Sequence, residues 1–252
     1  MAGSLAILTA CAHEAQLVRR VLQAQRQLSC SVGYLWQGTV HRQEVTLLQC
    51  GMGATRAAQG VLWIRQHTQP TGVLSVGFAG ALQADLGVGD ALLSTHVFSQ
   101  DIDAPILHPD ARLAHVATMA VAQTAIVSHA GTLLSTTAVL AQAAVKQMVG
   151  RLSGALAVDM ESYSVGQTAT TCQLPFAVLR TIFDPVHEDF ALPVATCTTV
   201  TGSLQPVRLA GCLCAQPWLL SRLPYWWWAS RVAGRHLQQW LQAFFLLVEQ
   251  GA

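Results

Sequence analysis

Three acidic residues stand where carboxylates commonly do chemistry in α/β proteins. Glu14 follows a short apolar run over residues 5–10, Glu161 begins a stretch with helical spacing, and Asp184 ends another apolar run over residues 176–183. Ligands of α/β folds bind beyond the carboxyl ends of strands, so these positions suit a binding site. A carboxyl with a raised pKa can donate a proton, and an ionised one can accept hydrogen bonds from hydroxyls. The pattern therefore favours acid–base chemistry, although helix-start charges and a strand-end cap are the alternative roles.

The elements around Glu161 and Asp184 can be placed from the local pattern. Apolar and small residues recur at helical spacing from Glu161 to Cys172, which predicts a helix with Glu161 in its first turn. Leu174-Pro175 ends that helix, and the apolar run that follows predicts a buried strand. We expect Glu161 to stay ionised, because the positive end of the helix dipole favours a carboxylate.

The rest of the chain alternates between strand-like and helix-like segments. The predicted strands cover residues 5–10, 45–49 and 72–78, and the predicted helices cover about 14–28, 54–67 and 237–248. Such alternation predicts an α/β fold, and 252 residues suit a single domain of this class.

Composition excludes several classes of protein. Charged residues make up 11% of the chain and the mean hydropathy is +0.40, yet no apolar run reaches the length of a membrane span. So little charge indicates large subunit contacts or a membrane-facing surface. The net charge of +1 argues against a nucleic-acid partner, which would need a basic face. The first residues lack a basic signal-peptide region, so we expect a cytoplasmic protein.

Metal ligation has little support in the sequence. The seven cysteines include no CxxC pair, and the one CxC, Cys212 and Cys214, is weak evidence for a site. Small buried thiols in a reducing compartment explain them better. The nine histidines form no helical pair supported by a carboxylate, so we predict no metal.

Several motifs resemble the nucleoside phosphorylase/nucleosidase superfamily, which contains purine nucleoside phosphorylase and methylthioadenosine/S-adenosylhomocysteine nucleosidase. These motifs are Asp159-Met160-Glu161, Pro175-Phe176 and the strand-end Asp184. A second signature, a strand that enters a glycine turn, is matched by Gly77, Ala79, Gly80, Gly89 and Asp90. The resemblance implies a three-layer αβα fold with a mixed central sheet. It also implies a homo-oligomer that binds a small-molecule nucleoside and needs no cofactor.

The resemblance also implies roles for individual residues. Asp184 would protonate the leaving purine, Glu161 would hold the ribose hydroxyls, and Glu14 would position or activate the attacking water. The implied substrate-binding residues are Met160, Phe78, Ala79, Gly80, Val139 and Leu140. Val139 departs from the family, which often places an aromatic stacking partner there.

The nucleophile could be water or phosphate. In the resembling purine phosphorylases, an arginine and a serine flank the glycine of the turn, and Ser75 and Phe78 occupy those places here. Phosphate needs cationic or dense donor groups, so this departure favours hydrolysis. Arg180 lies inside the strand, where hydrolases of the family also carry arginine. A phosphate-binding Arg56, or an arginine from a neighbouring subunit, remains an alternative.

The C-terminal region narrows the resemblance to the hopanoid-associated branch of the superfamily. The matching positions are Asp184-Pro185, Leu192-Pro193, Pro217, Leu223-Pro224 and Arg231. This branch implies release of adenine from adenosylhopane to give ribosylhopane. The alternatives are a soluble methylthioadenosine/S-adenosylhomocysteine-type nucleosidase, a phosphorolytic purine nucleoside phosphorylase, and a non-catalytic nucleoside sensor.

The same region is expected to form an extension of the single domain. We place the domain over residues 1–252 and its apolar, Trp-rich extension at about 204–252. Tryptophans 218 and 226–228 beside basic residues suit a membrane interface, which would make the protein peripheral at the inner membrane. Packing of these aromatics on the domain or at a subunit contact is the alternative.

Overall fold

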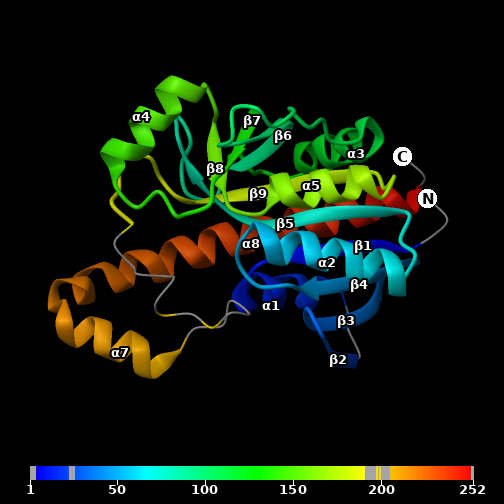
Figure 1. The fold of residues 1–252 in the computed structure, drawn as a ribbon, viewed down its shortest axis with the longest axis horizontal. Helices are drawn as coiled ribbons and strands as arrows, with labels where there is room; N and C mark the ends of the chain where they lie inside the picture. The colour runs from blue at the N-terminus through cyan, green and yellow to red at the C-terminus, as the bar shows by residue number, and fades with distance from the viewer. Residues whose placement is uncertain (1–3, 23–25, 191–196, 198, 200–204, 251–252) are drawn as a thin grey trace.

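A mixed β-sheet forms the centre of the molecule. The computed structural model describes residues 4–22, 26–190, 197, 199 and 205–250. Figure 1 shows the sheet with helices on both sides, which confirms the predicted three-layer α/β architecture. The strands are β1 Leu5–Thr9, β2 Arg26–Cys30, β3 Gly33–Val40, β4 Gln43–Gln49, β5 Gly72–Ala81, β6 Ala91–Ser99, β7 Ser128–Ser135, β8 Ala157–Asp159 and β9 Phe176–Asp184.

The strand order brings distant parts of the sequence to one edge of the sheet. The described strands run in the order β2-β3-β4-β1-β5-β8-β7-β6-β9, and β9 also pairs with β5, which closes the last five into a ring. β1, β4, β5 and β9 pair in parallel, so their carboxyl ends point the same way. A register irregularity between Ala79 and Gly80 sets Gly80 opposite Asp184 of β9 and Val158 of β8. This junction positions the candidate site.

Helices cover the two faces of the sheet because the strands alternate their side chains. Leu5 and Ile7 of β1 belong to one hydrophobic cluster with α1, α3 and α8, while Ala6 and Leu8 belong to a second with α2 and α5. The helices are α1 Ala12–Val21, α2 Ala54–His67, α3 Ala111–Ala122, α4 Ala143–Ser153, α5 Ser162–Thr171, α7 Pro206–Ala215 and α8 Leu223–Gln250, with a 3₁₀ helix, η1, at Pro217–Arg222.

One predicted helix is partly wrong. The sequence indicated a helix over residues 14–28, but α1 ends at Val21 and residues 26–30 form strand β2. β2 pairs antiparallel with β3, where Leu28 lies opposite Leu35 and packs against the second hydrophobic cluster. Pairing in this hairpin and the packing of Leu28 therefore override the helical spacing. The predicted helix over 54–67 agrees with α2.

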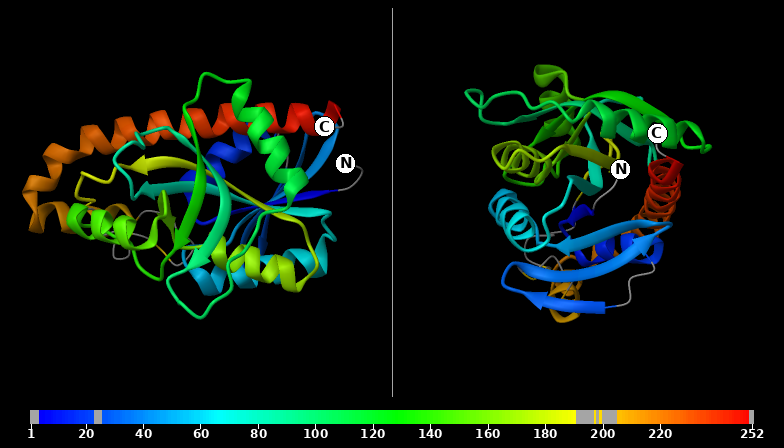
Figure 2. Two further views of the ribbon diagram at one scale, coloured as in Figure 1. Left: turned by 90° about the horizontal axis from the view of Figure 1, so that it is seen from above. Right: turned by 90° about the vertical axis from the view of Figure 1, so that its right-hand side faces the viewer.

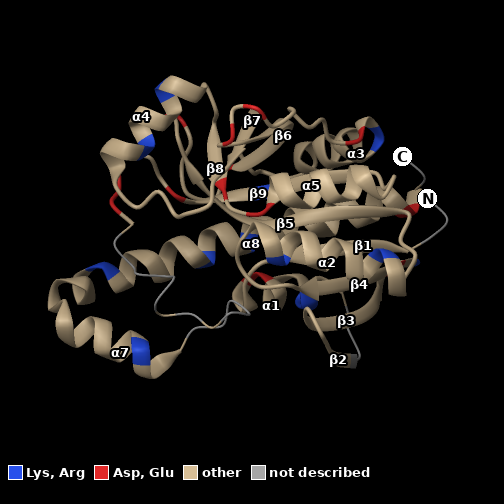
Figure 3. Cartoon of the chain, viewed as in Figure 1, with Lys and Arg blue, Asp and Glu red and all other residues tan. Residues whose placement is uncertain are grey.

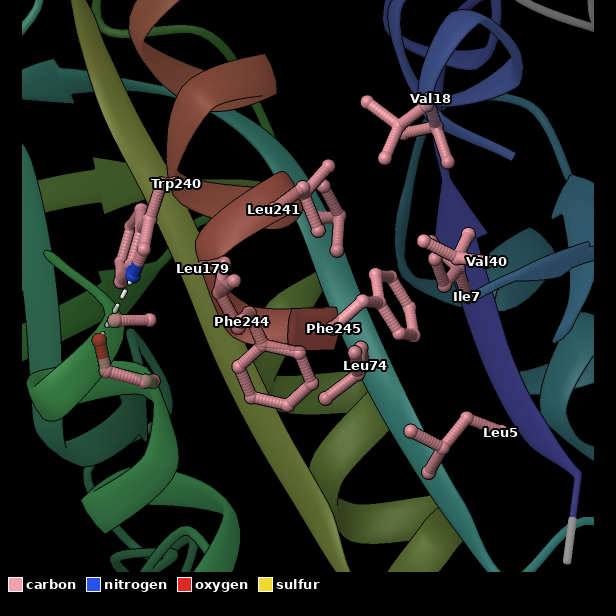
Figure 4. Packing of buried hydrophobic residues seen from close by; sticks show 14 of the residues in the cluster. Leu5, Ile7, Val18, Val40, Leu74, Leu179, Trp240, Leu241, Phe244 and Phe245 are labelled. Atoms are coloured by element: carbon pink, nitrogen blue, oxygen red, sulfur yellow. Dashed lines mark hydrogen bonds between the residues drawn. The ribbon is translucent and has the colours of Figure 1, made fainter. Parts of the chain in front are cut away.

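Helix α8 is much longer than the predicted 237–248 and has two environments. Its C-terminal half is buried against the sheet, where Trp240, Phe244 and Phe245 are fully enclosed (Figure 4). The indole Nε1–H of Trp240 donates to the Ala117 carbonyl of α3 over 2.8 Å. Within the described ranges, no helix is both long and apolar enough to cross a membrane.

The N-terminal part of α8 projects from the body together with α7 and η1. We call residues 206–231 the C-terminal arm; Figures 1 and 2 show it extending beyond the sheet layers. None of the residues of α7 is buried. Leu192-Pro193, one of the motifs of the C-terminal resemblance, lies outside the described residues.

Candidate active site

A cavity of about 180 Å³ opens beyond the carboxyl ends of β1, β5 and β9. Glu14, Glu161 and Asp184 all line it, so the three carboxylates that the sequence singled out come together in one pocket. The remaining lining residues are Ala10, Cys11, Met52, Phe78, Ala79, Gly80, Thr136, Ala138, Val139, Leu140, Val158, Asp159, Met160, Phe183 and Phe190.

Glu14 reaches from the first turn of α1 across to β5. Its Oε1 accepts a hydrogen bond from the backbone N–H of Phe78 at 2.9 Å, and its Oε2 accepts from the N–H groups of Ala10 and Cys11, each at 3.0 Å. These three bonds hold the buried carboxylate in place and give both of its oxygens a partner. A side chain at Gly77 would overlap the Glu14 carboxylate, so the glycine is needed for this close approach.

A buried ion pair lies beneath the pocket. Arg180 of β9 donates from Nε to Asp159 Oδ2 at 2.9 Å and from Nη2 to the hydroxyls of Ser75 and Ser162 at 2.8 and 3.0 Å. Asp159 also accepts from the Ser135 hydroxyl at 2.5 Å. Both charged groups are almost fully buried, and these hydrogen bonds offset part of the cost of removing the pair from water.

One donor of that arginine has no partner. Arg180 Nη1 is buried and lacks a hydrogen bond within the described structure. It lies close to Gly77, since a Cβ built on that glycine would be 3.2 Å from Nη1 and nearer still to Glu14 Oε1. An unpaired guanidinium N–H is costly when buried. Arg180 is not part of the cavity lining, so its charge acts on the pocket through the carboxylates beside it.

Glu161 is the N-cap residue of α5, one position before the predicted first turn. Its Oε1 accepts a hydrogen bond from the N–H of Gly53 at 2.7 Å, in the glycine turn that follows β4. Burial, followed by the nearby negative charge of Asp159, raises the pKa of Glu161 to about 8. Burial and Asp159 thus favour the protonated form of Glu161, against the expectation that the helix terminus keeps this carboxyl ionised.

Asp184 ends β9 and forms an ion pair that the sequence did not predict. Lys146 of α4 donates from Nζ to Asp184 Oδ1 at 2.8 Å, and to the carbonyls of Pro185 and Glu188, each at 2.7 Å. Lys146 is completely buried, so all its donor capacity is directed at this turn. The ammonium group thus fixes one carboxylate oxygen of Asp184.

The environment of Asp184 favours its protonated form more than usual. Burial raises the pKa of Asp184 to about 6, although the Lys146 ammonium pulls it down. A carboxyl that titrates near neutral pH can act as a general acid. Asp184 has this property because it is largely buried at the end of an apolar strand, in a cavity that Phe183 and Phe190 also line.

The predicted substrate-binding residues also line the cavity. Phe78, Ala79 and Gly80 come from the end of β5, Met160 precedes α5, and Val139 and Leu140 come from the loop after β7. Val139 is 43% exposed at the rim, so a larger side chain has room there. Sequence reasoning missed Phe183 and Phe190, whose aromatic character near Asp184 was the available signal.

Lys146 was missed although it carries a recognisable signal. It follows the apolar residues 143–145 at the start of α4, where exposure to solvent would be the ordinary expectation for a lysine. Its partner lies 38 residues away on β9, a separation that no local pattern encodes. Among the described residues, no cluster of His, Cys, Asp and Glu could hold a metal ion.

The chain is similar to known proteins in sequence and in structure. The family model described as "Phosphorylase superfamily" matches residues 4–201. A methylthioadenosine/S-adenosylhomocysteine nucleosidase of Halalkalibacterium halodurans is 29% identical over 195 residues, which cover 71% of this chain and 84% of the relative.

Solved structures extend the similarity beyond that segment. The nucleosidase of Neisseria meningitidis in complex with methylthio-immucillin-A has a TM-score of 0.72 at 18% identity, covering 96% of this chain and 98% of that one. A futalosine hydrolase mutant of Helicobacter pylori has a TM-score of 0.65 at 21% identity, covering 71% and 88%. At these identities the structures establish a shared fold.

Proposed function

The chain belongs to the phosphorylase superfamily, and from that premise we propose that it cleaves the N-glycosidic bond of an adenine nucleoside. The observation that supports this most is the convergence of Asp184, Glu161 and Glu14 on one cavity. Breaking such a bond leaves an oxocarbenium-like sugar. It needs a proton for the leaving base, a fixed ribose and a nucleophile at C1′. The three carboxyls supply one of these requirements each.

Asp184 is the proton donor in this proposal. Its proton passes to N7 of the purine as the bond between C1′ and the base breaks, and the electron pair of that bond stays on the base. The resulting Asp184 carboxylate faces Lys146 Nζ at 2.8 Å, so the new negative charge forms beside a fixed ammonium group. Lys146 is accordingly a positioning residue, since it acts on the substrate only through Asp184.

Glu161 holds the ribose. Its pKa of about 8 favours the protonated form at neutral pH, which can donate one hydrogen bond to a ribose hydroxyl and accept another. Met160 packs beside it in the lining and provides an apolar surface for the sugar.

Water fits the nucleophile better than phosphate. No residue of the described cavity lining is Lys or Arg, and phosphate is a strongly hydrated anion that needs such groups. Arg56 instead contacts the Cys50 carbonyl at 3.4 Å. Glu14 lines the cavity and takes a proton from the water as the water oxygen attacks C1′. The products are then adenine and the free sugar.

The 5′ substituent of the nucleoside separates two candidate substrates. Relatives at up to 29% identity are named as methylthioadenosine/S-adenosylhomocysteine nucleosidases, which supports a soluble 5′-thionucleoside. Adenosylhopane is the second candidate, and the apolar rim near Phe183 and Phe190 favours it. In both cases the same bond to adenine is broken.

Adenine release from each candidate tests the proposal. Methylthioadenosine and detergent-dispersed adenosylhopane are each incubated with the full chain, with and without phosphate. We expect adenine from at least one of them without phosphate. A requirement for phosphate would overturn hydrolysis, and release from neither would overturn the proposed function. The ratio of the two rates decides the 5′ group.

A further inference from the structure

The C-terminal arm exposes a group of large apolar side chains. Trp218, Trp227 and Trp228 are 56%, 63% and 48% exposed, and Val207 and Leu220 are 84% and 53% exposed. Soluble proteins seldom leave so many large apolar side chains together on one projecting element. The group therefore marks a surface that contacts something apolar.

The charge of the arm is all of one sign. Between Phe190 and Val248 the sequence contains no Asp or Glu, whereas Arg208, Arg222 and Arg231 lie in the arm. Figure 3 shows basic but no acidic residues on α7 and the adjoining half of α8. Arg208 and Arg231 are exposed, and the Arg231 guanidinium lies 4.8 Å from the Trp227 ring centre. Exposed indoles beside arginines suit the headgroup region of an anionic membrane.

We propose that the C-terminal arm is a docking surface for an anionic lipid bilayer. Indole and leucine side chains would enter the boundary between headgroups and acyl chains, and Arg208 and Arg231 would contact lipid phosphates. A second copy of this chain fits the surface less well. A two-fold contact between two such arms would set arginines against arginines with no acidic residue from the arm between them.

An aromatic path joins this surface to the cavity. The ring of Phe78 lies 5.7 Å from that of Phe183, Phe183 lies 5.8 Å from Phe190, and Phe190 lies 6.0 Å from Trp226. Trp226 is buried in the first turns of α8, next to the exposed Trp227. An apolar 5′ group could follow this path from the pocket to the bilayer. This link rests on the proposed nucleosidase function, whereas docking itself does not.

Vesicle sedimentation of the full chain tests the docking. Vesicles of phosphatidylcholine alone are compared with vesicles of phosphatidylcholine and phosphatidylglycerol, at low and high salt. We expect binding to the anionic vesicles, weaker binding to the neutral ones, and release by salt. Equal binding to both, or binding to neither, would overturn the proposal.

Matched variants locate the surface. We expect W227S/W228S to abolish most of the binding and R208Q/R231Q to weaken it by about fivefold for each arginine removed. The control R112Q/R151Q removes two exposed arginines from α3 and α4 and should bind like the wild type. If the arm variants also bind like the wild type, the arm is not the docking surface.

Two further readouts separate the remaining explanations. Gel filtration of W227S/W228S should show the wild-type size, and a smaller particle would assign the surface to a second copy of the chain. Adenine release from soluble methylthioadenosine should be unchanged in both arm variants, because these residues lie outside the cavity lining. Docking and the nucleosidase function can therefore fail independently of one another.

Discussion

The acidic residues on the two sides of the pocket have different charged neighbours. On one side, the charges of Glu14, Asp159 and Glu161 all act on a single buried cation, Arg180. On the other side, Asp184 forms an ion pair with Lys146. Burial, followed by the charge of Asp159, raises the pKa of Glu161 to about 8, whereas burial opposed by Lys146 raises that of Asp184 only to about 6. Burial thus raises both pKa values, and the neighbouring charge sets the difference between them.

Replacing Asp184, the proposed proton donor beside Lys146, should have the largest effect on catalysis. We expect Asp184→Asn to lower kcat/KM for adenine release by about 10²–10⁴-fold, because the amide keeps the shape but has no transferable proton. Steady-state assays measure the loss, and a thermal melt checks that the fold is intact. A loss of less than about tenfold would show that Asp184 is not the general acid.

Replacing Arg180, the buried cation on which Glu14, Asp159 and Glu161 all act, should have the largest effect on stability. Arg180→Met leaves the Asp159 carboxylate buried without its partner, which we expect to cost about 3–5 kcal/mol in the free energy of unfolding. Urea titration measures this cost. Arg65→Met, on the exposed face of α2, is the control and should change little. A similar loss in both variants would argue that the buried pair has no special role.

The raised pKa of Glu161 also predicts how the stability of the fold depends on pH. The Glu161 carboxyl ionises near 4.5 in the unfolded chain but near 8 in the folded one, so the stability it contributes is complete below pH 4.5 and is lost as the pH rises through 8. We expect Glu161→Gln to remove this loss and to be more stable than the wild type at pH 8.5 by about 2–4 kcal/mol. Denaturation at pH 5 and 8.5 tests it, and an unchanged difference between the two proteins at both values contradicts it.

Replacing Lys146 should change the pKa of Asp184. The ammonium lowers the pKa of Asp184, so Lys146→Met should raise that pKa. The limb of kcat/KM that falls as Asp184 loses its proton would then move to higher pH, by about one unit. Lys146→Arg keeps the charge and should restore the original limb. A uniform loss of activity at every pH would indicate that Lys146 only supports the fold.

The smallest expected effect concerns the rim. Val139→Phe adds an aromatic ring where the side chain is partly exposed, and stacking on the base should tighten adenine binding by about 0.5–1.5 kcal/mol. Isothermal titration with adenine measures the change. Unchanged or weaker binding would mean that the base does not lie against Val139.

The positions of the catalytic candidates could be predicted from sequence because each follows a local signal. Glu14 and Asp184 come directly after apolar strands, and Glu161 begins a helix, so a strand or helix boundary locates each one. The fold class followed from the same alternation of patterns. Strand β2 was mistaken for helix because its pairing with β3 is invisible to helical spacing.

The partners of those residues could not be predicted in this way. Ser75 meets Arg180 across 105 residues, and Lys146 meets Asp184 across 38. The ionisation of Glu161 depends on the same kind of contact, since Asp159 and burial raise its pKa only once the pocket is assembled. Local patterns give the reactive groups, while the charges that tune them come from the packed structure.

The burial of the second half of α8 has a consequence for the way this chain is synthesised. Trp240, Phe244 and Phe245 pack with α1, α3 and the sheet, yet β9, the last described strand, already ends at Asp184. A ribosome releases the strands first, so one face of the sheet stays uncovered until residues 240–248 have also left the exit tunnel. During that interval Leu5, Ile7 and Leu74 are open to aggregation. A premature stop between Asp184 and Trp240 therefore leaves a sheet without its cover.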